Sequence, residues 1–173
     1  MTTKPENLAY HEGGHVVMAY VVHRRFKYAS VEPGKDHKGL ASFQDPGKWL
    51  ESDMKPMKPR SRNEAEKEIL CILAGSEALK LFTGTDNLSP SDVDSCTGDY
   101  EAALHVARSV CEEPEELSAY VEWLTLRTRN ILRTTANWNR VRAVARELVK
   151  THRIGYIKAR KIIRRTDSSP VST

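Results

Sequence analysis

The chain has 173 residues, with 27 Lys and Arg against 23 Asp and Glu and a formal net charge of +4. This length suits one compact domain and is too short for two ordinary ones. Because the basic residues are mixed with nearly as many carboxylates, the composition does not indicate a nucleic-acid-binding protein, and we expect no nucleic acid among its partners.

The three cysteines, Cys71, Cys96 and Cys111, are odd in number and have no CxxC spacing. This pattern predicts neither a disulfide framework nor a cysteine zinc knuckle, and it suits a reducing compartment. No signal peptide or membrane span is visible in the sequence. We therefore expect a cytoplasmic protein without a membrane span.

The first predicted element is a helix that runs to about Val22 and contains the motif HEGGH. Thr3 and Glu6 have the spacing of a capping box at its start. Gly13 and Gly14 lie inside this helix, where each costs about 1 kcal/mol relative to Ala. Close packing or a nearby site is the expected reason for them.

Two short strands are predicted next, in the segments FKYASV and GLASF between Phe26 and Phe43. The turn-rich segment EPGKDHKG separates them. We expect a hairpin or a small sheet here. The Pro- and Gly-containing residues 45–60 that follow are predicted to form an irregular loop.

A second long helix is predicted after Ser61, which has the capping-box spacing with Glu64 and precedes the apolar segment EILCILAGSEALKLF. Its nearly continuous apolar character favours a central, buried position. The polar residues 83–98 interrupt the pattern, and another helix is predicted over 99–111.

The C-terminal part is predicted to contain a helix over 114–134, with Pro114 in its first turn, and one over 137–152, with Gly155 just past its end. Residues 166–173 are predicted to be a disordered tail. We therefore expect one domain over 1–165, mainly α with a small β-sheet.

The motif HEGGH carries the strongest chemical signal. His11 and His15 are four residues apart, so on a helix their imidazoles emerge from one face and can share a tetrahedral zinc ion. Glu12 lies beside them, where it can accept a proton from an activated water molecule. The alternative is a pair of buried histidines that make only local hydrogen bonds.

A catalytic zinc ion normally takes three protein ligands, so a third must come from elsewhere. On the helix predicted over 99–111, Asp99 is the charged side chain of an otherwise apolar face, and such a carboxylate is costly unless it is paired or binds a metal. Asp99 is therefore the expected third ligand. A helix-capping role for Asp99 remains open, with Asp92 and Asp94 as the substitute ligands.

The segment AYHEGGHVVMAY resembles the active-site helix of the peptidase domain of FtsH-type ATP-dependent zinc metalloproteases. The resemblance continues through KYASVEPGKDHKGLASFQDP, ILAGSEAL and TGDYEAALHVARSV, and through the C-terminal segment NILRTTANWNRVRAVARELVKTHRIGYIKARKII. It implies the FtsH-peptidase fold, Zn²⁺ as cofactor, Asp99 as the aspartate ligand that the family places in the fourth segment, and substrate pairing with the edge of the small sheet.

The sequence also departs from the family pattern. Gly13 stands where the family usually has alanine. Leu79 and Lys80 stand after the small-residue motif, in place of the charged residues that are common there in the family. Because we see neither an ATPase module nor a transmembrane segment, ATP dependence is not carried over. The expected activity is hydrolysis of peptides or unfolded polypeptides, with a separate ATPase and an oligomeric state left open. The alternative is a non-catalytic zinc-containing module that binds peptides or regulates a partner.

Overall fold

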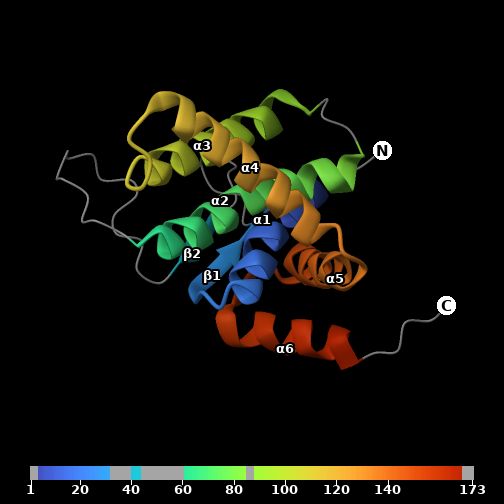
Figure 1. Cartoon of the computed structure of the whole chain (residues 1–173). Helices are drawn as coiled ribbons and strands as arrows, with labels where there is room; N and C mark the ends of the chain where they lie inside the picture. Colours follow the sequence, from blue (N-terminus) through green and yellow to red (C-terminus); the bar gives the residue numbers. More distant parts are fainter. Residues whose placement is uncertain (1–3, 32–39, 44–60, 85–87, 169–173) are drawn as a thin grey trace.

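A computed structural model describes residues 4–31, 40–43, 61–84 and 88–168. Within these residues the chain is mainly helical with a small antiparallel sheet, as predicted (Figure 1). The elements are α1 (Lys4–Val21), β1 (Phe26–Ser30), β2 (Leu40–Phe43), α2 (Arg62–Thr83), α3 (Pro90–Ala107), α4 (Pro114–Leu132), α5 (Thr135–Thr151), β3 (Arg153–Gly155) and α6 (Tyr156–Ser168).

The sheet has the strand order β2-β1-β3. The predicted hairpin is confirmed, since Ser30 of β1 pairs with Leu40 of β2 in antiparallel register. The third strand was not predicted from the sequence: Tyr28 of β1 also pairs with Gly155 of β3. The expected turn over 32–39 and the expected loop over 45–60 lie outside the described residues.

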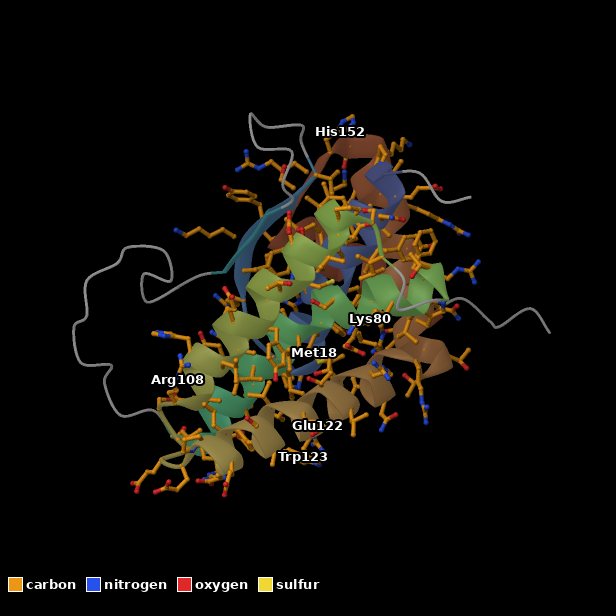
Figure 2. All side chains as sticks on the ribbon, turned by 90° about the horizontal axis from the view of Figure 1, so that it is seen from above. Met18, Lys80, Arg108, Glu122, Trp123 and His152 are labelled. Carbon is orange, nitrogen blue, oxygen red and sulfur yellow. The ribbon has the colours of Figure 1, made fainter. Side chains whose placement is uncertain are left out.

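Helices α1 and α2 pack together in the centre of the molecule, with α3 and α4 on one side and α5 and α6 on the other (Figure 1). Met18 of α1 is fully buried and lies in the middle of the side chains (Figure 2). A Cβ atom on Gly14 would collide with the Ala74 carbonyl and the Ala78 side chain of α2. The close packing expected around the glycines of HEGGH is therefore confirmed at Gly14.

Helix α2 begins and ends as its sequence predicts. The Ser61 side chain accepts a hydrogen bond from the Glu64 N–H, and the Glu64 carboxylate accepts one from the Ser61 N–H, which completes the capping box. Gly84 ends the helix in the left-handed conformation, at φ 66°.

Helix α3 begins earlier than predicted. We expected its start at Asp99, but the helix begins at Pro90, with the Ser89 side chain accepting a hydrogen bond from the Asp92 N–H. Ser followed by Pro is a strong N-terminal signal, and it outweighs the helix-breaking tendency of Gly98. The helix also ends at Ala107, four residues before the predicted end at Cys111.

The C-terminal boundaries also differ in detail. Helix α5 ends at Thr151, with His152 following it in the left-handed conformation at φ 59°, and Gly155, expected just past the helix end, is the last residue of β3. Helix α6 continues to Ser168, into the segment 166–173 for which a disordered tail was predicted, and 169–173 lie outside the described residues. None of the described helices is long and apolar enough to span a lipid bilayer.

Candidate metal centre

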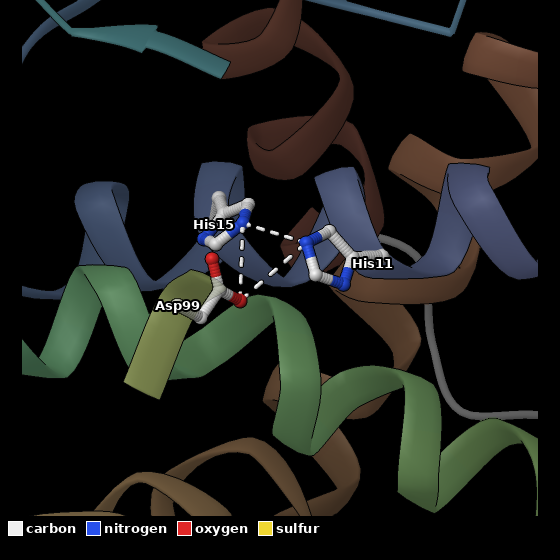
Figure 3. A group of neighbouring side chains, drawn as sticks. All are labelled: His11, His15 and Asp99. Carbon is white, nitrogen blue, oxygen red and sulfur yellow. Dashed lines mark hydrogen bonds and ion pairs between the residues drawn. The ribbon is translucent and has the colours of Figure 1, made fainter. Parts of the chain in front are cut away.

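Helix α1 presents both histidines of HEGGH toward α2 and α3. Both side chains are buried, and His11 Nε2 lies 3.1 Å from His15 Nε2 (Figure 3). The four-residue spacing on a helix is the local cause of this contact. The two ring nitrogens therefore face the same small volume.

Helix α3 adds Asp99 to this volume. Asp99 Oδ2 lies 3.5 Å from His11 Nε2 and 3.8 Å from His15 Nε2 (Figure 3). The Asp99 side chain is 17% exposed, more than either histidine, so the centre approaches solvent on the side of α3. The structure thus brings together the three residues that the sequence singles out as candidate metal ligands.

Asp99 lies well inside α3, so it does not cap the helix as the alternative interpretation required. The predicted division of the helix surface is present around it. Ala103, Val106 and Ala107 are buried, whereas Glu101 and His105 are exposed. The carboxylate therefore points from an apolar face, where it requires a partner.

Asp92 and Asp94, the substitute candidates, do not join the histidines. Asp92 Oδ2 accepts hydrogen bonds from Asn7 Nδ2 at 3.0 Å and from Ser89 Oγ at 2.6 Å, near the start of α3. Asp94 is exposed. Neither belongs to a cluster of potential metal ligands among the described residues.

The carbonyl of Cys71 in α2 selects the tautomer of His15. It lies 2.8 Å from His15 Nδ1, and because a carbonyl can only accept, Nδ1 carries the proton. In neutral His15 the lone pair is then on Nε2, the nitrogen that faces His11 and Asp99. His11 Nδ1 is buried without a hydrogen-bond partner among the described residues.

Two neighbouring residues of α2 complete the surroundings. A Cβ atom on Gly75 would lie only 2.7 Å from His11 Nε2 and still closer to His15 Nε2, so a side chain here would fill the centre. Ser76 Oγ donates a hydrogen bond to Asp99 Oδ2 at 2.9 Å. Sequence reasoning missed both roles, although the small residues of ILAGSEAL were a visible signal of close approach.

Glu12 is buried beside the two histidines, and its Oε2 has no hydrogen-bond partner among the described residues. Burial raises the pKa of Glu12 to about 7, an effect that His15 opposes and Asp99 strengthens. Burial also lowers the pKa of His11 to about 4, although Asp99 acts in the opposite direction. At neutral pH the His11 ring is therefore uncharged.

The pKa of His15 is raised above its ordinary value. Burial by itself lowers it, but the Asp99 and Glu12 carboxylates and the Cys71 carbonyl together outweigh that effect. His15 thus lies where positive charge is favoured. A metal cation would be stabilised by the same carboxylates.

The geometry fits a tetrahedral metal ion. Donor atoms that are each about 2.0–2.2 Å from a tetrahedral zinc ion lie roughly 3.3–3.6 Å from one another. The three separations in this centre, 3.1, 3.5 and 3.8 Å, bracket that range. Two neutral imidazoles and one carboxylate are also a donor set that zinc accepts, and three protein ligands are the number that catalytic zinc sites use when the fourth position is left to water or substrate.

Comparison with known proteins adds no family assignment: no protein-family model matches the chain, and no curated protein matches it. The function must therefore be inferred from the geometry of this centre and from the sequence resemblance.

Proposed function

We propose that the protein is a zinc-dependent endopeptidase with an FtsH-peptidase-like fold, in which His11, His15 and Asp99 bind the metal and Glu12 is the catalytic base. The convergence of three donor atoms at 3.1–3.8 Å carries this proposal, together with the buried Glu12 carboxylate, one oxygen of which has no hydrogen-bond partner in the part of the chain that the structure describes. The resemblance of HEGGH and of TGDYEAALHVARSV to that family supports it.

When bound, zinc supplies Lewis acidity toward a peptide carbonyl and makes water acidic enough to ionise near neutral pH. The residues of this chain handle the proton. Glu12 Oε2 is free to accept a proton from the attacking water, and the same carboxyl can pass it to the leaving amine. His15, held by the Cys71 carbonyl, and Asp99, held by Ser76, keep their donor atoms in place.

The expected substrates are peptides and unfolded polypeptides. Within the described residues β2 and β3 are the edges of the sheet, and an extended substrate can add a strand to such an edge. An unassisted enzyme should not digest stably folded proteins, so digestion of such proteins would require a separate ATPase that delivers the polypeptide.

The decisive experiment is cleavage of an unfolded protein by the zinc-loaded chain, by Glu12→Gln and by a chelator-treated sample. We expect Glu12→Gln to retain zinc but to lose activity about 10²–10⁴-fold, because the base is removed and the ligands are not. Glu101→Gln, on the exposed face of α3, is the matched control and should cleave like the wild type.

Equal cleavage by wild type and Glu12→Gln would refute the assignment of the base. Bound zinc without cleavage, in the presence of candidate ATPases as well as alone, would instead favour the non-catalytic peptide-binding module. Absence of zinc binding would refute the metal centre itself.

A further inference from the structure

Charge is distributed unevenly along the chain, contrary to the even mixture expected from the composition. Residues 135–168, which form α5, β3 and α6, contain ten Lys and Arg but only two Asp and Glu, a net formal charge of +8. The remainder of the chain therefore has a net formal charge of −4, since the whole chain has +4. Such an asymmetry points to an anionic partner.

Both carboxylates of this segment are used to join the two helices. Lys158 Nζ of α6 lies 2.6 Å from Glu147 Oε1 of α5, and Arg140 Nε of α5 lies 2.7 Å from Asp167 Oδ1 of α6. Glu147 is near the end of α5 and Lys158 near the start of α6, whereas Arg140 is near the start of α5 and Asp167 near the end of α6. The two helices are therefore antiparallel. The negative charges of this segment are therefore engaged between the helices.

Most of the other Lys and Arg side chains of this segment are exposed to solvent. We define the α5–α6 basic surface by its exposed basic residues without a carboxylate partner among the described residues: Arg142, Arg146, Lys150, Arg153, Lys161 and Arg164. A shallow hollow of about 690 Å³ follows the α6 part of this surface. It is lined by Ile157, Arg160, Lys161, Arg164, Arg165 and Ser168, which share one helical face.

Two exposed aliphatic side chains accompany these cations. Ile157 at the start of α6 is 84% exposed, and Val149 near the end of α5 is 40% exposed. Both lie toward the connection between the antiparallel helices, beyond the pair formed by Glu147 and Lys158. Ile157 lies beside Arg160 and Lys161 in the hollow. An exposed apolar side chain beside cations matches the interface of an anionic bilayer, where the apolar side chain enters the headgroup region and the cations meet phosphate.

Aromatic side chains argue against single-stranded nucleic acid as the partner. The two aromatic residues of this segment, Trp138 and Tyr156, are both partly buried against the core. The Tyr156 ring packs edge-on against Phe26, with 5.5 Å between the ring centroids. No exposed aromatic ring is thus available in this segment for stacking with bases.

We propose that the α5–α6 basic surface docks the protein on membranes that contain anionic phospholipids. This proposal is independent of the metal centre. Helix α6 lies on the opposite side of the central helices from α3, which carries Asp99 (Figure 1). A protein docked through α6 therefore keeps the α3 side of the centre turned away from the lipid.

The test is sedimentation of the full chain with vesicles of phosphatidylcholine alone and with vesicles that also contain phosphatidylglycerol. We expect binding only to the latter, weakening as salt is added because the charges are screened. Arg164→Glu should weaken it about tenfold. Arg108→Glu has the same charge change at the end of α3, far from His152 and the α5–α6 connection, and should bind like the wild type (Figure 2).

A second pair of variants tests the apolar contribution. Ile157→Ser should weaken binding about fivefold, whereas Leu126→Ser, which replaces a 51% exposed residue of α4, should have no effect. Equal losses for Arg164→Glu and Arg108→Glu would overturn the proposal, because they would indicate a dependence on net charge only. Binding to DNA or RNA in place of the anionic vesicles, or binding to neither, would overturn it as well.

Discussion

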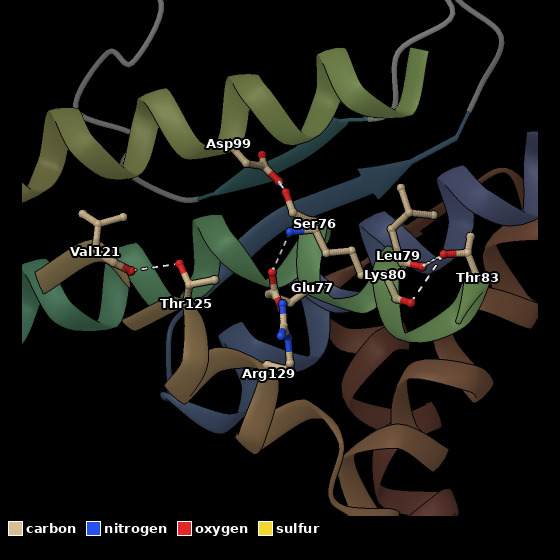
Figure 4. A network of polar contacts seen from close by, with 9 residues as sticks. All are labelled: Ser76, Glu77, Leu79, Lys80, Thr83, Asp99, Val121, Thr125 and Arg129. Carbon is tan, nitrogen blue, oxygen red and sulfur yellow. Dashed lines mark hydrogen bonds and ion pairs between the residues drawn. The ribbon is translucent and has the colours of Figure 1, made fainter. Parts of the chain in front are cut away.

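Ser76 and Glu77, two consecutive residues of α2, belong to two different polar regions of the molecule. Ser76 donates to Asp99 in the candidate metal centre, and Glu77 is paired with Arg129 of α4 and Lys80 (Figure 4). Both Glu77 oxygens have a partner, Lys80 Nζ at 3.1 Å and Arg129 Nε at 2.6 Å. In the metal centre, by contrast, Glu12 Oε2 and His11 Nδ1 are buried without partners among the described residues.

The difference separates a structural buried carboxylate from one that is available for chemistry. Glu77 and Glu12 are both almost inaccessible to solvent. A fully paired buried carboxylate stabilises the native packing, whereas an incompletely paired one destabilises it unless a ligand or a reaction uses the free atom. Substitutions in the two regions should therefore have different effects on stability and on metal binding.

Glu77→Gln should destabilise the fold by about 2–4 kcal/mol, because it removes the buried carboxylate charge that pairs with Arg129 and Lys80. The loss is limited because both cations reach solvent. Urea unfolding in chelator measures it. The control is Glu66→Gln, which removes a partly exposed pair with Arg127 and should cost less than about 1 kcal/mol. Similar losses for both variants would mean that burial of the Glu77 pair has no special importance.

Asp99→Ala should lower zinc affinity by at least about a hundredfold, because it removes one of the three proposed ligands. Removing a ligand costs more affinity than removing a residue that only hydrogen-bonds to a ligand. Competition with a chromophoric chelator measures the affinity. Asp92→Ala changes a carboxylate of the same helix that is bonded to Asn7 and Ser89, and it should have a far smaller effect. The opposite ranking would assign the third ligand to Asp92.

Glu12→Gln should stabilise the metal-free protein above neutral pH, in contrast to Glu77→Gln. The folded-state pKa of about 7 is raised above the ordinary value of 4.5, so the folded state binds more protons between these values. The contribution of Glu12 to stability therefore falls as the pH rises through this window. We expect the variant to gain roughly 1–3 kcal/mol at about pH 8 and little at about pH 4.5. Thermal unfolding at both pH values would show a pH-independent difference if this explanation were wrong.

Ser76→Ala should lower zinc affinity about tenfold while leaving the metal-free fold intact, because Ser76 orients the Asp99 carboxylate. In an Asp99→Ala background the same change should have no further effect on affinity. Thr125→Ala removes a hydroxyl that donates to the Val121 carbonyl of α4, away from the centre, and is the matched control (Figure 4). Additive losses in the double variant would show that Ser76 acts by some other route.

Much of the fold could be predicted because its signals are local. The capping box of Ser61 and Glu64, the Pro at the start of α4 and the hairpin of β1 and β2 all follow from short segments. Strand β3 could not be predicted in this way. It has three residues, and it exists because β1 offers Tyr28, Ala29 and Ser30 as pairing partners.

The start of α3 was misjudged for a related reason. The polar composition of residues 83–98 and Gly98 indicated a loop, although Ser89 and Pro90 provided a valid helix start. A Cβ atom on Gly98 would meet nothing within 4 Å, so this glycine marks neither a turn nor a close contact. Composition over a long window was therefore a weaker guide than the two residues at the helix start.

The pairing of His11 with His15 follows from the sequence alone, because side chains four residues apart on a helix emerge from the same face. The sequence also ranked Asp99 above Asp92 and Asp94, because only Asp99 interrupts an apolar helical face. The individual atomic contacts of the centre, in contrast, depend on the packing of distant segments. The Cys71 carbonyl that orients His15 is 56 residues away in the chain, and Ser76 is 23 residues from Asp99. Such contacts depend on how α1, α2 and α3 pack, and the close approach that Gly14 and Gly75 permit is a property of that packing.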